Sequence, residues 1–411
     1  MQDYNIFYKY VLMLLLLMVS GMPLYMHGDN VKLGVFIIIG IVFFIKNISF
    51  YFINRSFING SNLLVLVSFS FVIFVIQFFK FNFFPLETIL GFYIYVLTAY
   101  MVVTLLGNSF IAIYIRAMYY IAILSLIFYF ALNLNILNYG ILDSFSLKIN
   151  SARDVFSFLG VFTFFLDDIQ RNSGIFWEPG AFGGYLIIAL MFNFFISTRN
   201  KLKYNIVFIT AILSTLSSSS YIAAIIFFSI IKILKYKSIA LKIISLILMF
   251  ILGLFVFFNT SILSDKITSQ IKIAEIGNAY GDNNNTQRFL NLLRDKEDIE
   301  GHVLFGRGLN PETRYLYKKE DQIRTVGLTD FFVRFGIFFY FFIFVTMFMS
   351  IRRILLYYHI KRKAYSYLIF SIICILLFSE VYFNYAFFWS FVFFGITYKS
   401  KFNFKKNTII S

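Results

Sequence analysis

Charged residues are scarce in this chain. Lys, Arg, Asp and Glu make up 14% of its 411 residues, against about 25% in a soluble domain. The single cysteine, Cys374, excludes an internal disulfide. No two of the three histidines stand at metal-ligand spacing and no acidic cluster resembles a metal site, so we expect no metal and no cofactor. A Gly-rich phosphate loop ending in Lys-Ser/Thr is also absent, which argues against an ATP-driven pump.

Long apolar segments make up most of the chain. Hydrophobic residues account for 60% of it, including 58 phenylalanines. Only helices and closed barrels satisfy the backbone within a bilayer, and the apolar runs here are continuous rather than alternating, which favours helices. We predict an all-α polytopic membrane protein with about 12 transmembrane helices, forming a single integral membrane domain over residues 1–411. The first apolar run lacks a small-residue cleavage site after it, which favours a retained span.

The net charge of +16 indicates membrane topology rather than nucleic-acid binding. Alternate loops are basic with almost no acids, which is typical of the cytoplasmic side. The opposite connections carry mixed charge and include two long polar stretches, residues 133–178 and 259–325. We therefore predict cytoplasmic termini and two large extracytoplasmic loops. The basic loops contain Lys46 and Arg55, Arg116, Arg199 to Lys203, Lys232 to Lys242, Arg352 to Lys363, and the tail from Lys399.

Two regions have lengths that do not suit a simple span. Val155 to Leu166 is nearly all apolar but too short to cross the bilayer, and its charged flanks predict a helix lying in the interface. The apolar stretches 205–216 and 221–234 on either side of Ser217 to Ser220 are also short. They predict a re-entrant or tightly folded hairpin, or serines that lie within the membrane.

The ten residues from Arg171 to Gly180 stand at the entrance to the sixth predicted span. A charge so close to the bilayer is usually functional or paired. Two interpretations are open: an ion pair between Arg171 and Glu178 that clamps the loop, or an Arg171 guanidinium that binds phosphate oxygens in a bidentate manner. Pro179 suits the first turn of the span.

The second outer stretch supplies more cations. Arg288 follows an Asn-rich turn typical of a helix N-terminus. In Gly306-Arg307-Gly308, the glycines allow a backbone nest that can hold an anion. Arg334 lies within a predicted span, where it can either pair with Asp330 at i, i+4 or supply a cation to a substrate. Two further arginines of this region are Arg314 and Arg324.

Several of these motifs together resemble one known group. The first is Arg171-x-x-Gly174-x-x-x-Glu178-Pro179 at the start of a span. The others are Thr215-Leu216-Ser217, Arg288 followed by a helix, Leu304-Phe305-Gly306-Arg307-Gly308, Gly327-Leu328-Thr329-Asp330 and Arg334-Phe335-Gly336. They are similar to patterns of the Wzy-type O-antigen and capsular polysaccharide polymerases, which are related to the O-antigen ligases. The resemblance covers about residues 171–336, and the first 150 residues match only in hydropathy.

The resemblance implies a metal-independent glycosyltransferase on the outer face of the bacterial cytoplasmic membrane. Its donor would be a glycan on undecaprenyl pyrophosphate and its acceptor a lipid-linked repeat unit. The expected partners are these undecaprenyl-pyrophosphate-linked oligosaccharides and membrane lipid, with a chain-length regulator and a flippase as candidate protein partners and no nucleic acid. Because the leaving group is a pyrophosphate, arginines that stabilise its growing charge suit the transition state.

Members of this group often carry a histidine shortly before the span that follows the large loop. Residues 323–328 contain none, so Glu178, His302 or Arg324 would have to take its place. The predicted catalytic residues are Glu178, Arg288 and Arg171. The predicted substrate-binding residues are Arg307, Gly306, Gly308, Arg324 and Gly174.

Three other functions remain open. An O-antigen ligase would move the glycan to another acceptor. A polysaccharide or lipid transporter predicts charges deep within several spans and internal repeats, whereas here the charges gather in two loops on one side. A purely structural membrane protein leaves the outer arginines without a role.

Overall fold

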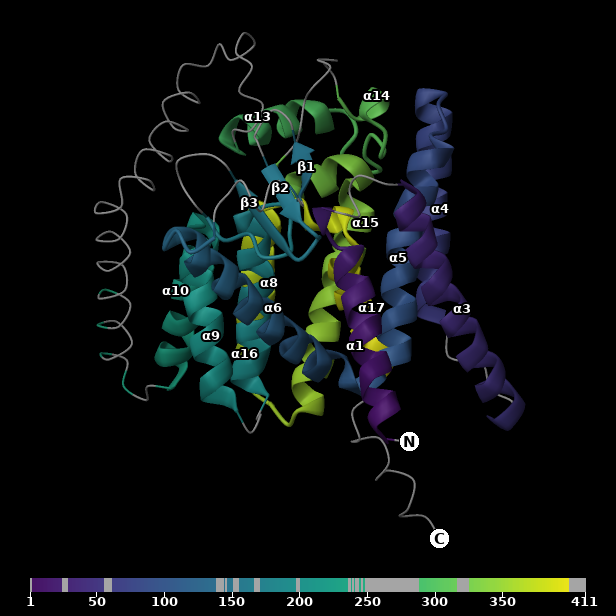
Figure 1. Ribbon diagram of the computed structural model, residues 1–411. Helices are drawn as coiled ribbons and strands as arrows, with labels where there is room; N and C mark the ends of the chain where they lie inside the picture. Colours follow the sequence, from purple (N-terminus) through teal and green to yellow (C-terminus); the bar gives the residue numbers. More distant parts are fainter. Residues whose placement is uncertain are drawn as a thin grey trace.

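The computed structural model describes residues 2–23, 29–54, 61–137, 146–150, 155–165, 171–196, 200–235, 288–315 and 325–398, with a few isolated positions between them. Most of these residues are helical, and the long helices run roughly side by side as a bundle (Figure 1). The main helices are α1 (Gln2–Met18), α3 (Asp29–Asn54), α4 (Ser61–Phe81), α5 (Leu86–Leu106), α6 (Phe110–Asn133), α8 (Pro179–Phe195), α9 (Lys201–Ser214), α10 (Ser218–Lys235), α15 (Gly327–Tyr357), α16 (Lys363–Ser379) and α17 (Ala386–Thr397). The short helices are η1 (Gly107–Ser109), α13 (Arg288–Ile299), α14 (Pro311–Arg314) and η2 (Tyr382–Asn384).

The architecture is that of a helical membrane protein. In the described part of the chain, three helical stretches are long and apolar enough to cross a membrane, namely Leu63–Phe81, Leu86–Asn133 and Gly327–Tyr357. Several shorter apolar helices pack with them. Large apolar side chains such as Phe71, Phe341 and Val345 are more than half exposed on the outside of the bundle, where lipid can cover them. The expected number of spans depends in part on residues 236–287, which lie mostly outside the described residues.

Helices α8 and α17 form the centre of the bundle. Every residue of α8 from Pro179 to Asn193 is buried, as expected for a helix that is apolar on all sides. Helix α17 packs against α5 and α15, and Trp389 is fully buried among aromatic rings. This central packing fixes the N-terminal ends of both helices at one end of the bundle.

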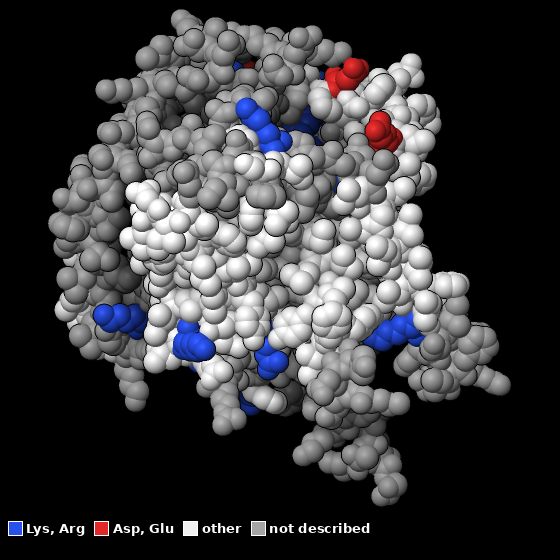
Figure 2. All heavy atoms as spheres, viewed as in Figure 1, with Lys and Arg blue, Asp and Glu red and all other residues white. Residues whose placement is uncertain are grey.

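Basic side chains mark one end of the bundle, called here the basic end. The Lys46 ammonium donates to the carbonyl of Leu105 at 2.9 Å, where α5 ends. Arg353, near the end of α15, donates to Gly395, near the end of α17, at 2.8 Å. Arg362 joins the start of α16 to the end of α10. In Figure 2 the charged side chains along the lower edge are all lysines and arginines, whereas the upper edge carries both basic and acidic side chains.

The opposite end, called here the site end, carries α13, α14 and a small antiparallel sheet (Figure 1). The sheet comprises β1 (Ser146–Asn150), β2 (Val155–Phe158) and β3 (Phe162–Phe165) in the order β1-β2-β3. The interfacial helix predicted for Val155 to Leu166 is therefore wrong, and the fold is not purely α. Gly160, at φ +71°, allows a tight turn, and the alternation Val-Phe-Ser-Phe suits a strand with one apolar face.

The short stretches around Ser217 form a tight hairpin. Helix α9 ends at Ser214 and α10 begins at Ser218, and Leu216 takes a left-handed φ of +46° between them. At 1.5 Å per residue, α9 is only about 21 Å long. The structure thus shows two short helices joined by a tight turn, and this turn lies beside the N-terminal half of α8 because Ser220 contacts Gly183. The position of the serines relative to the membrane stays a prediction.

Helix α15 is broken one third of the way along. Gly336 has φ +72° and ψ 179°, which is not helical. In a regular helix the N–H of Ile337 would donate to the carbonyl of Val333. Here Ile337 donates instead to Val303 at 2.8 Å, and Val333 accepts from Arg307 at 2.8 Å. The loop from Val303 to Gly308 is thus inserted into the hydrogen-bond ladder of α15.

Candidate functional site

Arg171 and Asn172 anchor the segment that precedes α8 on the turn between α9 and α10. The Arg171 guanidinium donates to the carbonyls of Thr215 and Leu216 at 3.1 and 3.0 Å. These are carbonyls at the C-terminal end of α9, where a cation is stabilised by the helix dipole. The Asn172 amide donates to the hydroxyls of Ser125 and Ser214. Arg171 therefore binds the turn after α9.

Glu178 lies beside a second carboxylate, that of Glu380. A methyl group placed on Gly180 would lie 2.7 Å from Oε1 of Glu380 and 3.4 Å from Oε1 of Glu178. The two side chains therefore face the same point at the N-terminus of α8. Glu178 is the residue that precedes α8, and Glu380 is the residue that follows α16. A helix N-terminus stabilises negative charge, which helps both carboxylates to share this position.

Buried tyrosines border the two carboxylates. Burial raises the pKa of Tyr382 well above its usual value, and the Glu380 and Glu178 carboxylates add to the shift. Tyr382 is therefore a neutral phenol, and its hydroxyl donates to the carbonyls of Gly180 and Ala181 at 3.2 Å. The ring of Tyr385 packs on the indole of Trp177 with centroids 4.5 Å apart. One side of the carboxylate pair is thus an aromatic wall.

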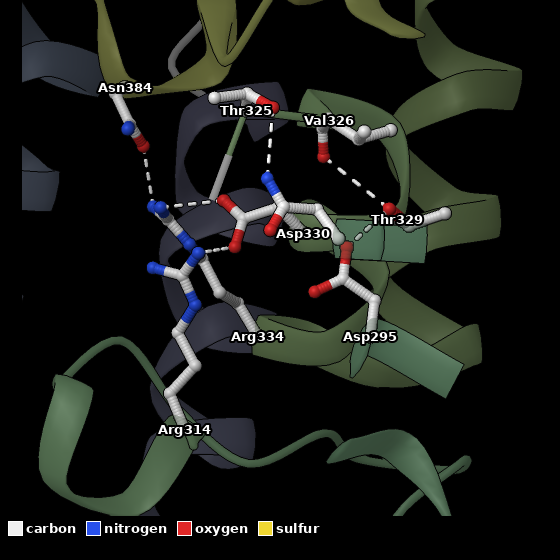
Figure 3. A network of polar contacts seen from close by, with 9 residues as sticks. Asp295, Arg314, Thr325, Val326, Thr329, Asp330, Arg334 and Asn384 are labelled. Carbon is white, nitrogen blue, oxygen red and sulfur yellow. Dashed lines mark hydrogen bonds and ion pairs between the residues drawn. The ribbon is translucent and has the colours of Figure 1, made fainter. Parts of the chain in front are cut away.

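Asp330 is the centre of a second charged cluster (Figure 3). Its carboxylate pairs with Arg334 at 2.6 Å and also with Arg314 of α14. The predicted i, i+4 pair is confirmed, and Arg314 adds a second cation to it. Arg334 also donates to the side-chain oxygen of Asn384. Beside this cluster, Asp295 accepts from the hydroxyl of Thr329, which joins α13 to α15.

The connection between α16 and α17 joins the two clusters. It carries Glu380 at one end and Asn384 at the other. The backbone carbonyl of Glu380 also packs against Gly327 so closely that no side chain would fit there. A polar row therefore crosses the site end of the bundle. It is formed by Arg314, Asp330, Arg334, Asn384, Glu380 and Glu178.

The backbone nest expected at Gly306-Arg307-Gly308 is wrong. All three N–H groups donate to backbone carbonyls, at 2.8 Å to His302, 2.8 Å to Val333 and 3.0 Å to Arg334. Two of them bind the broken turn of α15 and the third binds within the loop, so none of the three is directed at an anion. A side chain at Gly306 would meet the carbonyl carbon of Arg334 at 2.6 Å. The glycines therefore serve the close contact between this loop and α15.

Arg307 points toward a separate surface near the end of α4. Its Nε donates to the carbonyl of Thr313 at 2.8 Å, and its guanidinium lies over the ring of Phe81. His302 stacks on the same ring with centroids 5.2 Å apart. Burial lowers the pKa of His302, so its imidazole is neutral at pH 7. This histidine, one of the candidate bases, does not belong to the polar row.

Sequence reasoning located only part of this site. Glu178 and Arg334 were identified, whereas Glu380 and Asn384 were not. Their signal is the short polar interruption Ser379-Glu380-Val381-Tyr382-Phe383-Asn384 between two apolar runs. Of the other candidates, Gly174 has φ +54° and packs under the ring of Phe182. Arg288 begins α13 without a described side chain, and Arg324 lies outside the described residues.

Comparisons with known proteins give no match. No protein-family model matches this chain, and no curated protein matches it.

Proposed function

We propose that this chain is a polysaccharide polymerase of the outer face of the bacterial cytoplasmic membrane. It transfers a glycan from undecaprenyl pyrophosphate to a lipid-linked repeat unit. The observation that carries the proposal is the polar row, in which two arginines and two glutamates gather at the end of an apolar bundle opposite the basic end. By the positive-inside rule, the basic end faces the cytoplasm and the polar row faces outward.

The reaction needs a cation for the leaving pyrophosphate and a base for the acceptor. Arg314 and Arg334 place two guanidinium groups around Asp330. Guanidinium groups suit an anionic leaving group, whose charge grows as the bond to the anomeric carbon breaks. Arg171, Arg288 and Arg307 remain candidates for the flanking lipid pyrophosphate, and Arg324 and Gly174 remain candidates for binding the substrate.

Glu178 and Glu380 suit the base. In the proposed step the acceptor hydroxyl oxygen attacks the anomeric carbon, the bond from that carbon to the pyrophosphate oxygen breaks, and the hydroxyl proton passes to one of the two carboxylates. Both carboxylates face Gly180 at the start of α8, so either one can accept the proton from an acceptor bound there. This pair would replace the histidine that the resembling group often carries.

A transporter of lipid-linked glycan is the second candidate, and the break in α15 favours it. Discontinuous helices are typical of transporter binding sites. The two functions differ in one measurement, because a polymerase joins repeat units in detergent solution, where no transport is possible. Polymer formed from purified lipid-linked repeats by the purified protein in detergent supports the enzyme, and its absence with retained lipid binding supports the transporter.

Complementation of a deletion strain tests the base assignment. We expect deletion to abolish long polymer while single repeats remain, whereas a ligase deletion would accumulate free lipid-linked polymer. Glu178→Gln and Glu380→Gln should each lower polymer by about 100-fold or more, the usual contribution of a general base. Glu87→Gln is the matched control, because Glu87 is exposed at the start of α5. Normal polymer from Glu380→Gln would remove Glu380 from the mechanism.

A further inference from the structure

A cavity of about 210 Å³ lies near the basic end, between α4, α15 and α17. Val65 and Leu66 line it from α4, Phe342 and Met349 from α15, and Gly395 from α17. It lies far from the polar row along the bundle, since Val65 stands four residues into α4 and Gly395 two residues before the end of α17. At 1.5 Å per residue this is about 3–6 Å from the helix ends.

The cavity opens on the side of the bundle that faces lipid. On α15, Phe341, Val345 and Met349 follow one another at i, i+4 spacing and are 60%, 53% and 50% exposed. Val65 on α4 is 53% exposed. Arg353 is the next residue of the α15 stripe, and it is exposed as well. An apolar stripe thus ends in a cation at the depth where phospholipid headgroups begin.

Arg353 is held in place with donors to spare. One terminal nitrogen donates to the carbonyl of Gly395 at 2.8 Å. A methyl group on Gly395 would lie 2.7 Å from that nitrogen, so glycine is needed for the contact. Gly395 in turn donates to the hydroxyl of Ser350. Among the described residues no acidic partner of Arg353 is found within ion-pair distance. The N–H groups that remain are those through which a guanidinium binds phosphate oxygens.

We propose that this cavity binds an anionic phospholipid of the leaflet at the basic end. The phosphate contacts Arg353, and the upper part of an acyl chain fills the space between Val65, Phe342 and Met349. The volume is below the range of about 300–1,000 Å³ for pockets that enclose a whole ligand. Only part of the lipid is therefore enclosed, and the rest of the chain lies along the exposed α15 stripe. Anionic lipid is enriched in the cytoplasmic leaflet, where the basic end is expected.

Lipid retention by the full-length protein tests this site. The purified protein in detergent is mixed with phosphatidylglycerol or phosphatidylcholine, and bound lipid is counted by native mass spectrometry. Wild type should retain phosphatidylglycerol preferentially. Arg353→Gln should retain it about tenfold less, the effect of losing about 1.4 kcal/mol. Arg352→Gln is the matched control, because Arg352 instead contacts the carbonyls of Ile360 and Lys361.

Val65→Phe keeps Arg353 but fills the cavity, and it should also lower retention. Tryptophan fluorescence and gel filtration check that each variant is folded. Equal retention by the Arg353 and Arg352 variants would overturn the site, since general surface charge would then account for binding. Displacement of the lipid by millimolar inorganic phosphate would also overturn it, because the site would then recognise a free anion alone.

Discussion

At the scale of single residues, Asp330 shows how the charges of the site are held. It is 2% exposed and lies between Arg314 and Arg334 (Figure 3). Removing charges from water is costly unless each one has a partner. Asp330 supplies a partner to both arginines, and Asn384 gives Arg334 a further acceptor. The stability of the cluster therefore depends more on Asp330 than on either arginine alone.

Asp330→Asn should destabilise the protein by about 3–5 kcal/mol, because the buried Arg314 guanidinium and the partly buried Arg334 guanidinium lose their shared counterion. The measurement is thermal unfolding in detergent followed by tryptophan fluorescence, for which Trp177 and Trp389 are both in the packed interior or beside it. Glu87→Gln, at an exposed position, should leave the midpoint temperature of thermal unfolding unchanged. An unchanged midpoint in Asp330→Asn would show that the arginines are solvated or paired elsewhere.

At the scale of elements, the break in α15 and the loop from Val303 to Gly308 form one unit. Neither is stable alone, because the loop satisfies the N–H and carbonyl groups that the break leaves without helical partners. Gln77 of α4 completes the unit by donating to the carbonyls of Phe305 and Arg334 at 2.6 and 2.8 Å. This unit sets the position of Arg334 in the polar row, because the break begins just after that residue.

Gly336→Ala and Gly306→Ala should each destabilise the protein by about 2 kcal/mol or more. Both glycines have positive φ, which strains an alanine, and an added methyl would meet backbone atoms of the facing segment. Gly91→Ala is the control, since nothing lies within 4 Å of its added methyl group. Thermal unfolding again gives the result, and equal midpoints for Gly336→Ala and Gly91→Ala would contradict the inserted loop.

At the scale of the whole molecule, the charges are sorted between the two ends of the bundle. The basic end holds lysines and arginines at the ends of α5, α10, α15 and α17. The site end holds the acidic residues of α13 together with the polar row. This sorting predicts the orientation of the protein in the membrane.

Cysteine labelling tests that orientation. In a Cys374→Ala background, Glu300→Cys at the site end should react with an impermeant maleimide in intact cells, whereas Lys361→Cys at the basic end should react only after lysis. Both positions are exposed, so access to the thiol depends on the side of the membrane. Labelling of Lys361→Cys alone in intact cells would reverse the orientation and place the polar row in the cytoplasm.

The hydropathy pattern alone predicted a mostly helical membrane protein, because long continuous apolar runs satisfy their backbone in lipid as helices. The order of basic and mixed loops along the chain predicted the grouping of charge. The sequence also indicated the Asp330–Arg334 pair, since i, i+4 contacts are local. Three features became visible only in the folded chain: Glu380 and Glu178 both face Gly180, Arg171 binds the turn after α9, and residues 303–308 enter the hydrogen-bond ladder of α15. These contacts join residues from 26 to 202 positions apart. They follow from how helices pack side by side, which hydropathy and spacing along the chain do not specify.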